Sequence, residues 1–237
     1  MLCLKRRGRF SEHRFRGGRC AAGRARFDAL SIHPYSLGAK PGQSAAIDGN
    51  VFIANVPTLA KMLRLAARSR RTFTRRPQLW VTEFAMFTNP PNKSIGEPPQ
   101  QAGLHTAEAL YRLWKAGVNT VTWHMLFEGE AGGFLVPGGA LIDQSGREKP
   151  TYHALRFPRF VRHEGNRTLI WGRAPKPNAK VSFGGRVAPI VSGPDGVFTR
   201  RFAGRLRGEL TATQGGVRSL ETPAAAGPGS VPAERRR

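Results

Sequence analysis

Four side chains in the sequence carry the chemical groups that a sugar-processing site uses. His33 and Tyr35 follow one apolar run, Glu83 lies near the end of a second, and Trp123 lies near the end of a third. A carboxylate can act on an anomeric carbon, imidazole and phenol groups can hydrogen-bond around it, and an indole can lie against the apolar face of a sugar ring. These residue types predict a carbohydrate site with Glu83 as its catalytic carboxylate and His33, Tyr35 and Trp123 as substrate-binding residues.

The three apolar runs predict strands over residues 27–33, 78–84 and 118–125, with helices over about 56–71 and 100–116 between them. Alternation of strands and helices at this spacing predicts parallel βα units. In parallel α/β barrels the chemistry lies at the C-terminal ends of the strands. We therefore expect the four candidate side chains at one edge of one sheet.

A different pattern begins after about residue 162. Short apolar runs recur at intervals of roughly ten residues, separated by Gly, Pro, Asn and Asp, which predicts a small β-sandwich. The predicted organisation is a disordered basic tail, an α/β domain, a small β-sandwich-like domain and a disordered Pro/Ala/Gly tail, over residues 1–26, 27–160, 165–215 and 216–237.

Several segments resemble, in their order and spacing, the C-terminal part of clan A glycoside hydrolases such as families 5 and 39. Trp80–Phe84 (WVTEF) resembles the seventh strand of those (β/α)₈ barrels, whose Glu is the nucleophile of a retaining mechanism. Residues 28–35 resemble the sixth strand with its His-x-Tyr ending, and residues 121–123 resemble the eighth strand with a Trp at the sugar subsite. Residues 133–135, 141–143 and 149–152 resemble the last loop and the start of the final helix.

This resemblance, over about residues 27–160, implies an α/β fold: a partial (β/α)₈ TIM barrel of about three C-terminal βα units, followed by a small all-β domain. It implies hydrolysis of O-glycosyl bonds with Glu83 as nucleophile and with no metal or organic cofactor. The sequence lacks the family's Asn-Glu acid/base motif and the first five barrel strands. We therefore expect a retaining glycoside hydrolase or a truncated remnant of one, whose unpaired barrel edges favour association.

Two other classes of function stay open. One is a non-catalytic carbohydrate-binding or cell-surface module, and the other is a basic nucleic-acid-binding protein. The net charge of +23 invites the second. However, the chain has 30 Arg and only 8 Lys beside abundant Ala, Gly and Pro, a bias that a GC-rich coding sequence also produces. We expect a carbohydrate partner and no nucleic-acid partner.

The remaining features exclude several kinds of site. No apolar run is long enough for a membrane-spanning helix, so no membrane partner is expected. Cys3 and Cys20 make neither a disulfide scaffold nor a zinc site, and no His spacing predicts a metal site. The N-terminus lacks the apolar stretch of a signal peptide, which leaves the localisation open. Glu128 and Glu130 are expected to be solvated loop acids, and His124 to be a packed histidine.

Overall fold

The structure of the chain is a computed structural model, which describes residues 4–7, 9–12, 24–46, 50–129, 137–184 and 187–223. The chain divides into two compact units. The first unit comprises Met1–Ser36, Gln43–Phe84 and Arg112–His124, and the second comprises Leu37–Gly42, Ala85–Tyr111 and Met125–Arg237.

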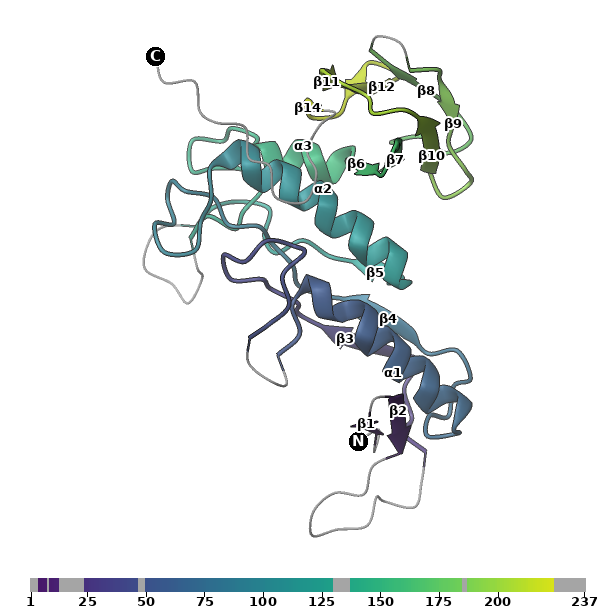
Figure 1. Ribbon diagram of the computed structural model, residues 1–237. Coiled ribbons are helices and arrows are strands. Elements are labelled where there is room, and N and C mark those ends of the chain that lie inside the picture. The colour runs from purple at the N-terminus through teal and green to yellow at the C-terminus, as the bar shows by residue number, and fades with distance from the viewer. Residues whose placement is uncertain are drawn as a thin grey trace. The chain divides into compact units, whose positions relative to one another are not determined.

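The first unit contains a three-stranded parallel sheet in the order β3-β4-β5 (Figure 1). The strands are β3 (Ala29–Ile32), β4 (Gln78–Val81) and β5 (Thr120–Val121). Parallel strands need crossover connections, which here contain α1 (Val56–Arg68) and α2 (Pro99–Ala116). The predicted parallel βα units are confirmed. The strands are shorter than predicted, because the ladder to β5 pairs only two residues of β4.

One face of this sheet is covered and the other is exposed. On the covered face, Leu79 and Val81 of β4 are buried. On the other face, Ser31, Trp80 and Thr120 lie side by side across the three strands, and all three are exposed. Parallel sheets normally have both faces covered, so the row through Trp80 is an unusual surface for such a sheet.

Helix α1 owes its position to an apolar stripe. Val56, Ala60, Leu63 and Ala66 recur every three or four residues, and all are buried. The 3-10 turn η1 (Ile53–Asn55) leads into the helix. The prediction that the helix reaches residue 71 is wrong at its end, because Arg70 adopts the left-handed conformation with φ of 55° and stops the helix at Arg68.

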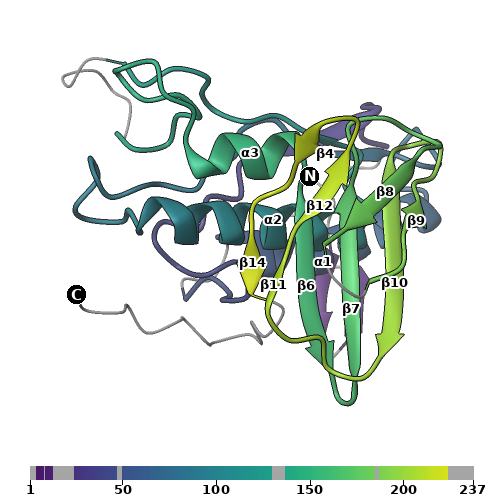
Figure 2. The ribbon, with the colours of Figure 1, turned by 90° about the horizontal axis from the view of Figure 1, so that it is seen from above.

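The second unit is mainly antiparallel (Figure 2). Helix α3 (Pro150–Arg156) precedes a sheet of β6 (Arg159–Glu164), β7 (Arg167–Arg173) and β10 (Val197–Ala203), in the order β10-β7-β6. A second sheet, in the order β13-β12-β8-β9, contains β8 (Lys180–Phe183), β9 (Ile190–Val191), β12 (Ala212–Gln214) and β13 (Val217–Arg218). Strands β11 (Glu209–Leu210) and β14 (Thr222–Pro223) form a separate pair.

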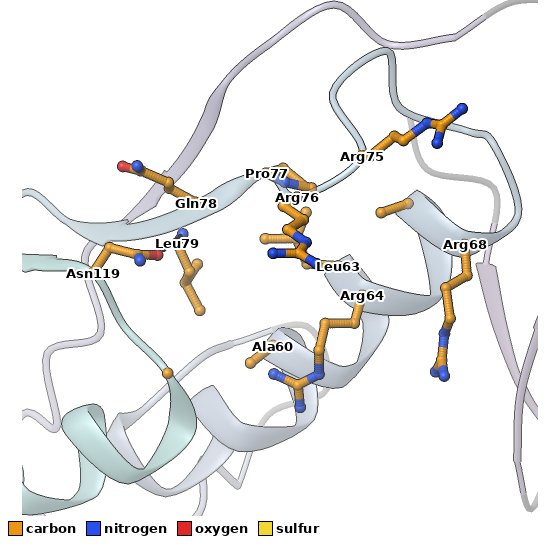
Figure 3. Close-up of a pocket in the computed structure, with 12 residues that line it drawn as sticks. Ala60, Leu63, Arg64, Arg68, Arg75, Arg76, Pro77, Gln78, Leu79 and Asn119 are labelled. Carbon is orange, nitrogen blue, oxygen red and sulfur yellow. Dashed lines mark hydrogen bonds between the residues drawn. The ribbon is translucent and has the colours of Figure 1, made fainter.

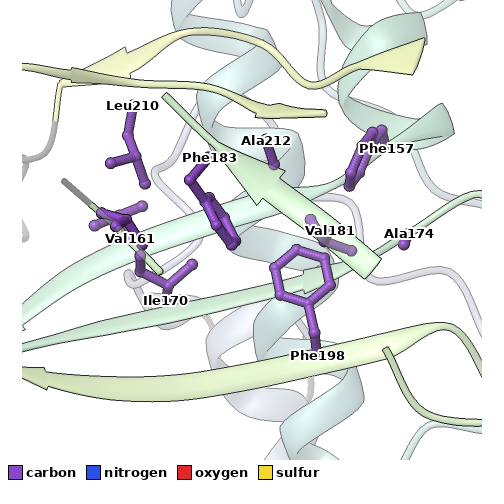
Figure 4. Packing of buried hydrophobic residues seen from close by; sticks show 10 residues of the cluster. Phe157, Val161, Ile170, Ala174, Val181, Phe183, Phe198, Leu210 and Ala212 are labelled. Carbon is purple, nitrogen blue, oxygen red and sulfur yellow. The ribbon is translucent and has the colours of Figure 1, made fainter. Parts of the chain in front are cut away.

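The two larger antiparallel sheets share one apolar core (Figure 4). The rings of Phe183 and Phe198 meet edge to face with centroids 5.8 Å apart, and Phe157 meets Phe198 in the same way at 6.3 Å. Ile170 of β7 and Val181 of β8 are fully buried in the same cluster. A shared core between two antiparallel sheets is the arrangement of a β-sandwich.

The structure differs from the predicted organisation in three places. The division into units does not fall between residues 160 and 165, because residues 85–111 and 125–149 belong with the C-terminal strands. Antiparallel structure extends from β6 to β14, beyond the predicted 165–215. Within the predicted basic tail, β1 (Leu4–Arg7) and β2 (Arg9–Glu12) pair antiparallel, since a local backbone ladder needs no apolar periodicity. Residues 1–3, 8, 13–23 and 224–237 lie outside the described residues, and with them Cys3 and Cys20.

The buried Arg159 accounts for the order of residues 216–223. It is only 2% exposed. Its guanidinium donates to the carbonyl oxygens of Leu210 and, at 2.8 Å, Leu220, and at 3.0 Å to the hydroxyl of Ser219. A buried charge needs such partners, so this one side chain ties the C-terminal strands to β6. The Pro/Ala/Gly composition of residues 216–237 could not predict this contact, because it depends on Arg159 more than 50 residues away in the sequence.

We expect Arg159→Met to lower the free energy of unfolding by about 2–4 kcal/mol, because it leaves the buried carbonyl of Leu210 and the partly buried carbonyl of Leu220 without their donor. Urea unfolding followed by circular dichroism measures the loss, and hydrogen exchange should increase over residues 210–223. Arg167→Met, at the exposed start of β7, is the matched control and should change stability by less than about 0.5 kcal/mol. Equal losses in the two variants would show that the Arg159 contacts do not hold the segment.

Candidate functional site

Three of the four predicted site residues lie together in the first unit, just beyond the ends of β3 and β4. The Tyr35 hydroxyl donates to Glu83 Oε2 at 3.2 Å. His33 Nδ1 lies 3.5 Å from the same oxygen. His33 Nε2 lies 3.0 Å from the hydroxyl oxygen of Thr82. The carboxylate of Glu83 is thus flanked by a phenol and an imidazole.

The strand register brings these residues together. Ile32 pairs with Val81, so the residues that follow them leave the sheet side by side. The backbone N–H of Thr82 still donates to the carbonyl of Ile32 at 3.3 Å. A tight turn follows, in which the N–H of Tyr35 donates to the carbonyl of His33 at 3.0 Å, and both side chains reach Glu83. The prediction that these three residues share one end of the sheet is confirmed.

Trp123 reaches the same neighbourhood through a different partner. Its ring packs edge to face against Phe84, with centroids 5.2 Å apart and an interplanar angle of 79°. Phe84 itself is fully buried. The backbone N–H of His124 donates to the carbonyl of Phe84 at 2.9 Å, which fixes the chain next to Trp123. Trp123 is half-buried.

The Tyr35 hydroxyl is held in its neutral form. Partial burial raises the pKa of Tyr35 far above its ordinary value, and the negative charge of Glu83 and the hydrogen bond to it raise this pKa further. Tyr35 is therefore a fixed donor to Glu83. Because a carboxylate only accepts, His33 also needs its proton on Nδ1 to donate to Glu83, and Nε2 then accepts from Thr82.

Glu83 is accessible as well as supported. Its side chain is 37% exposed, and that of His33 is 47% exposed. An exposed carboxylate whose orientation is fixed on one side can present its free oxygen to an electrophilic carbon. The geometry therefore suits a nucleophile or an anionic group that binds a ligand.

Besides Glu83, the described residues of this unit include two acids, Glu12 and Asp28. Asp28 belongs to the same unit, but it precedes β3 at the opposite end of the sheet, where Thr74 donates to it at 2.8 Å. No group of three or more potential metal ligands occurs among the residues that the structure describes. In the same residues, no helix is long and apolar enough to cross a membrane.

Glu128 corrects one expectation from the sequence. Its side chain is 7% exposed rather than solvated, and it forms an ion pair with Lys149, whose side chain is 8% exposed. Lys149 also donates at 3.3 Å to the hydroxyl of Thr88 and the carbonyl of Gly138. These residues belong to the second unit, so the pair holds loops there. The Lys149-Pro150 pair at the start of α3 is the sequence signal that could have indicated this ion pair. Glu130 and residues 133–135 lie outside the described residues.

We expect Glu83→Gln to lower the pKa of Tyr35, because the substitution removes the adjacent negative charge while burial remains. An NMR titration of the tyrosine rings measures this shift, and Glu209→Gln on the exposed β11 is the control. The folded state raises this pKa, so Tyr35 contributes stability below about pH 10, the ordinary pKa of tyrosine, and loses it as the pH rises through the raised value. An unchanged Tyr35 titration in the Glu83 variant would contradict the contact.

No family model matches the chain, and no curated protein matches it. Solved structures show distant similarity. One is a family 39 glycoside hydrolase from the gut symbiont Bacteroides cellulosilyticus WH2, with a TM-score of 0.45 and 16% identity, over 74% of this chain and 42% of that chain. Another is Bacteroides uniformis beta-glucuronidase 2, with a TM-score of 0.35 and 10% identity, over 83% of this chain and 26% of that chain. The chain thus spans less than half of either protein. Similarities of this size carry no information about activity or substrate.

Proposed function

We propose that the chain carries the nucleophile side of a retaining glycoside hydrolase site on part of a (β/α)₈ barrel. The observation that supports this is the exposed Glu83 carboxylate at the end of the central parallel strand, held by Tyr35 at 3.2 Å and flanked by His33 at 3.5 Å. Glu83 is the nucleophile, His33 and Tyr35 position it and bind sugar hydroxyls, and Trp123 offers its exposed ring surface to the sugar.

The reaction needs two carboxyl groups. Glu83 attacks the anomeric carbon, the carbon–oxygen bond to the leaving group breaks, and a glycosyl ester forms on Glu83. The second group protonates the leaving oxygen and then takes a proton from the water that hydrolyses the ester. Since the described part of the first unit holds no such group beside Glu83, the proposal places the acid/base on a segment or chain beyond those residues.

Because the nucleophile and the acid/base have separate roles, the nucleophile can be tested alone. A dinitrophenolate leaving group departs without protonation, so formation of the glycosyl ester needs only the nucleophile. We expect a panel of 2-deoxy-2-fluoro dinitrophenyl glycosides to release about one dinitrophenolate per chain and to leave a covalent adduct on Glu83, located by peptide mass spectrometry. Glycosides with poor leaving groups should turn over slowly, because the general acid normally contributes about 10²–10⁴-fold.

The variants decide between a glycosidase site and a non-catalytic module. Glu83→Gln should abolish the adduct, and Glu209→Gln should retain it. Adduct formation on another carboxylate, or on none, would overturn the role of Glu83. Sugar binding that is equal in the wild type and in Glu83→Gln, without any adduct, would instead favour a carbohydrate-binding module, which the single carboxylate of the site also suits.

We further propose that two copies of the chain associate through the exposed row of Ser31, Trp80 and Thr120 and the adjacent edges of β3 and β5. Trp80 is 37% exposed on a sheet face that parallel sheets normally cover. Open edges provide unpaired backbone groups for a second copy.

We expect Trp80→Lys to shift the protein toward the monomer in sedimentation velocity, because the charge opposes burial of that face. Val191→Lys, at a residue of β9 that is 68% exposed, is the matched control and should leave the association unchanged. A wild-type protein that stays monomeric at high concentration would rule out this interface.

A further inference from the structure

A second concave surface lies in the first unit, at the N-terminal end of the sheet. Its cavity of about 470 Å³ lies between α1, the start of β4 and the turn before β5 (Figure 3). Leu63 and Leu79 contribute buried apolar surface to its lining. A volume of this size is typical of sites for small molecules. Glu83 follows the opposite end of β4, so this cavity is separate from the candidate catalytic site.

Four arginines line the cavity: Arg64, Arg68, Arg75 and Arg76. Arg64 and Arg68 are one turn apart on α1, and the other two come from the segment that leads into β4. In Figure 3, Arg76 extends from this segment toward α1, while Arg68 and Arg75 point outward at the far side. Two separate elements thus bring positive charge to one opening.

These charges have no acidic partner in the part of the chain that the structure describes. The residues that line the cavity include no acid. Within the described part of the chain, none of the four guanidinium groups forms an ion pair. Like charges gathered in one place repel one another, and a bound anion relieves that repulsion.

Of the two side-chain amides in the lining, Asn119 remains a donor toward the cavity. The side-chain oxygen of Asn119 accepts from the N–H of Leu79 at 3.0 Å, and that of Gln78 accepts from the indole N–H of Trp80 at 2.7 Å. The Asn119 amide thus keeps its NH₂ group as a donor for a ligand, whereas the Gln78 side chain lies with Trp80 on the other face of β4. A lining whose side chains offer donors and no acceptor selects a ligand that is rich in acceptors.

We propose that this cavity binds a small organic molecule with two or more phosphoryl groups. Guanidinium groups bind phosphate oxygens with paired, charge-assisted hydrogen bonds. One phosphoryl group needs only one or two arginines, so Arg64 and Arg76 on separate elements, with Arg68 and Arg75 adding charge at the outer side, fit a chain of phosphoryl groups. The apolar surface of Leu63, Pro77 and Leu79 fits the organic part of the ligand.

Calorimetric titration of the full chain with inorganic tripolyphosphate and with orthophosphate tests the proposal. We expect tripolyphosphate to bind at least about tenfold more tightly, because it engages more guanidinium groups at once. The double variant Arg64→Gln/Arg76→Gln should lose about tenfold or more in affinity for tripolyphosphate. Arg64→Lys/Arg76→Lys keeps the charge but loses the planar fork, and it should show an intermediate loss.

The matched control removes the same charge elsewhere. Arg156 and Arg207 are exposed and lie outside the cavity, so Arg156→Gln/Arg207→Gln should bind tripolyphosphate within about twofold of the wild type. Equal losses in the two double variants would show that only the overall charge attracts phosphate, which would overturn the site. A single-stranded oligodeoxythymidylate that binds more tightly than tripolyphosphate, with the same loss in both variants, would assign the basic surface to nucleic acid instead. Circular dichroism confirms that each variant is folded.

Discussion

The parallel register between β3 and β4 is the constraint on which the rest of the first unit depends. Ile32 opposite Val81 makes the chain leave both strands at the same level, so His33 and Tyr35 meet Glu83. The same register places the start of β4, with Gln78 opposite Ala29, at the other end of the sheet. A shift of one residue would send the side chains of β4 to the opposite faces and would separate the carboxylate from its donors. One set of backbone hydrogen bonds therefore positions both the candidate catalytic site and the arginine-lined cavity.

The sequence predicted the elements best where periodicity and packing agree. Helix α1, the parallel strands and most strands of the second unit follow apolar patterns that reflect which face is buried. It failed where a single long-range contact decides the outcome. In the sequence, Arg159 and Glu128 look like surface charges. Burial of Arg159 depends on Leu210, which is 51 residues away in the sequence, and burial of Glu128 depends on Lys149, which is 21 residues away. For the candidate site, the sequence predicted that His33, Tyr35 and Glu83 lie at one end of the sheet, whereas the contact of Trp123 with Phe84 needed the structure.

The carboxylates of Glu83 and Glu128 have different partners in this chain. Tyr35 donates to Glu83 at 3.2 Å and His33 Nδ1 lies 3.5 Å from the same oxygen, so two side chains orient the carboxylate that we propose as a nucleophile. A general acid needs an environment that favours a protonated carboxyl group. Glu128, the most deeply buried carboxylate described beside a cation, is held as a partner of Lys149 and shows the structural use of a buried acid in this chain. Under the proposed mechanism, Glu83 takes the nucleophile role, and the acid/base role requires a different carboxyl group.

The exposed face of the parallel sheet and the arginine-lined cavity both lie where the apolar stripe of α1 does not pack. α1 uses its apolar stripe to cover one face of β4, which leaves Arg64 and Arg68 to project beside the sheet and leaves Trp80 uncovered on the far face. Neither feature is satisfied by the described residues: the tryptophan face lacks an apolar partner, and the guanidinium groups lack an anion. The surfaces left over, one apolar and one cationic, are chemically different, and each therefore selects a different kind of partner.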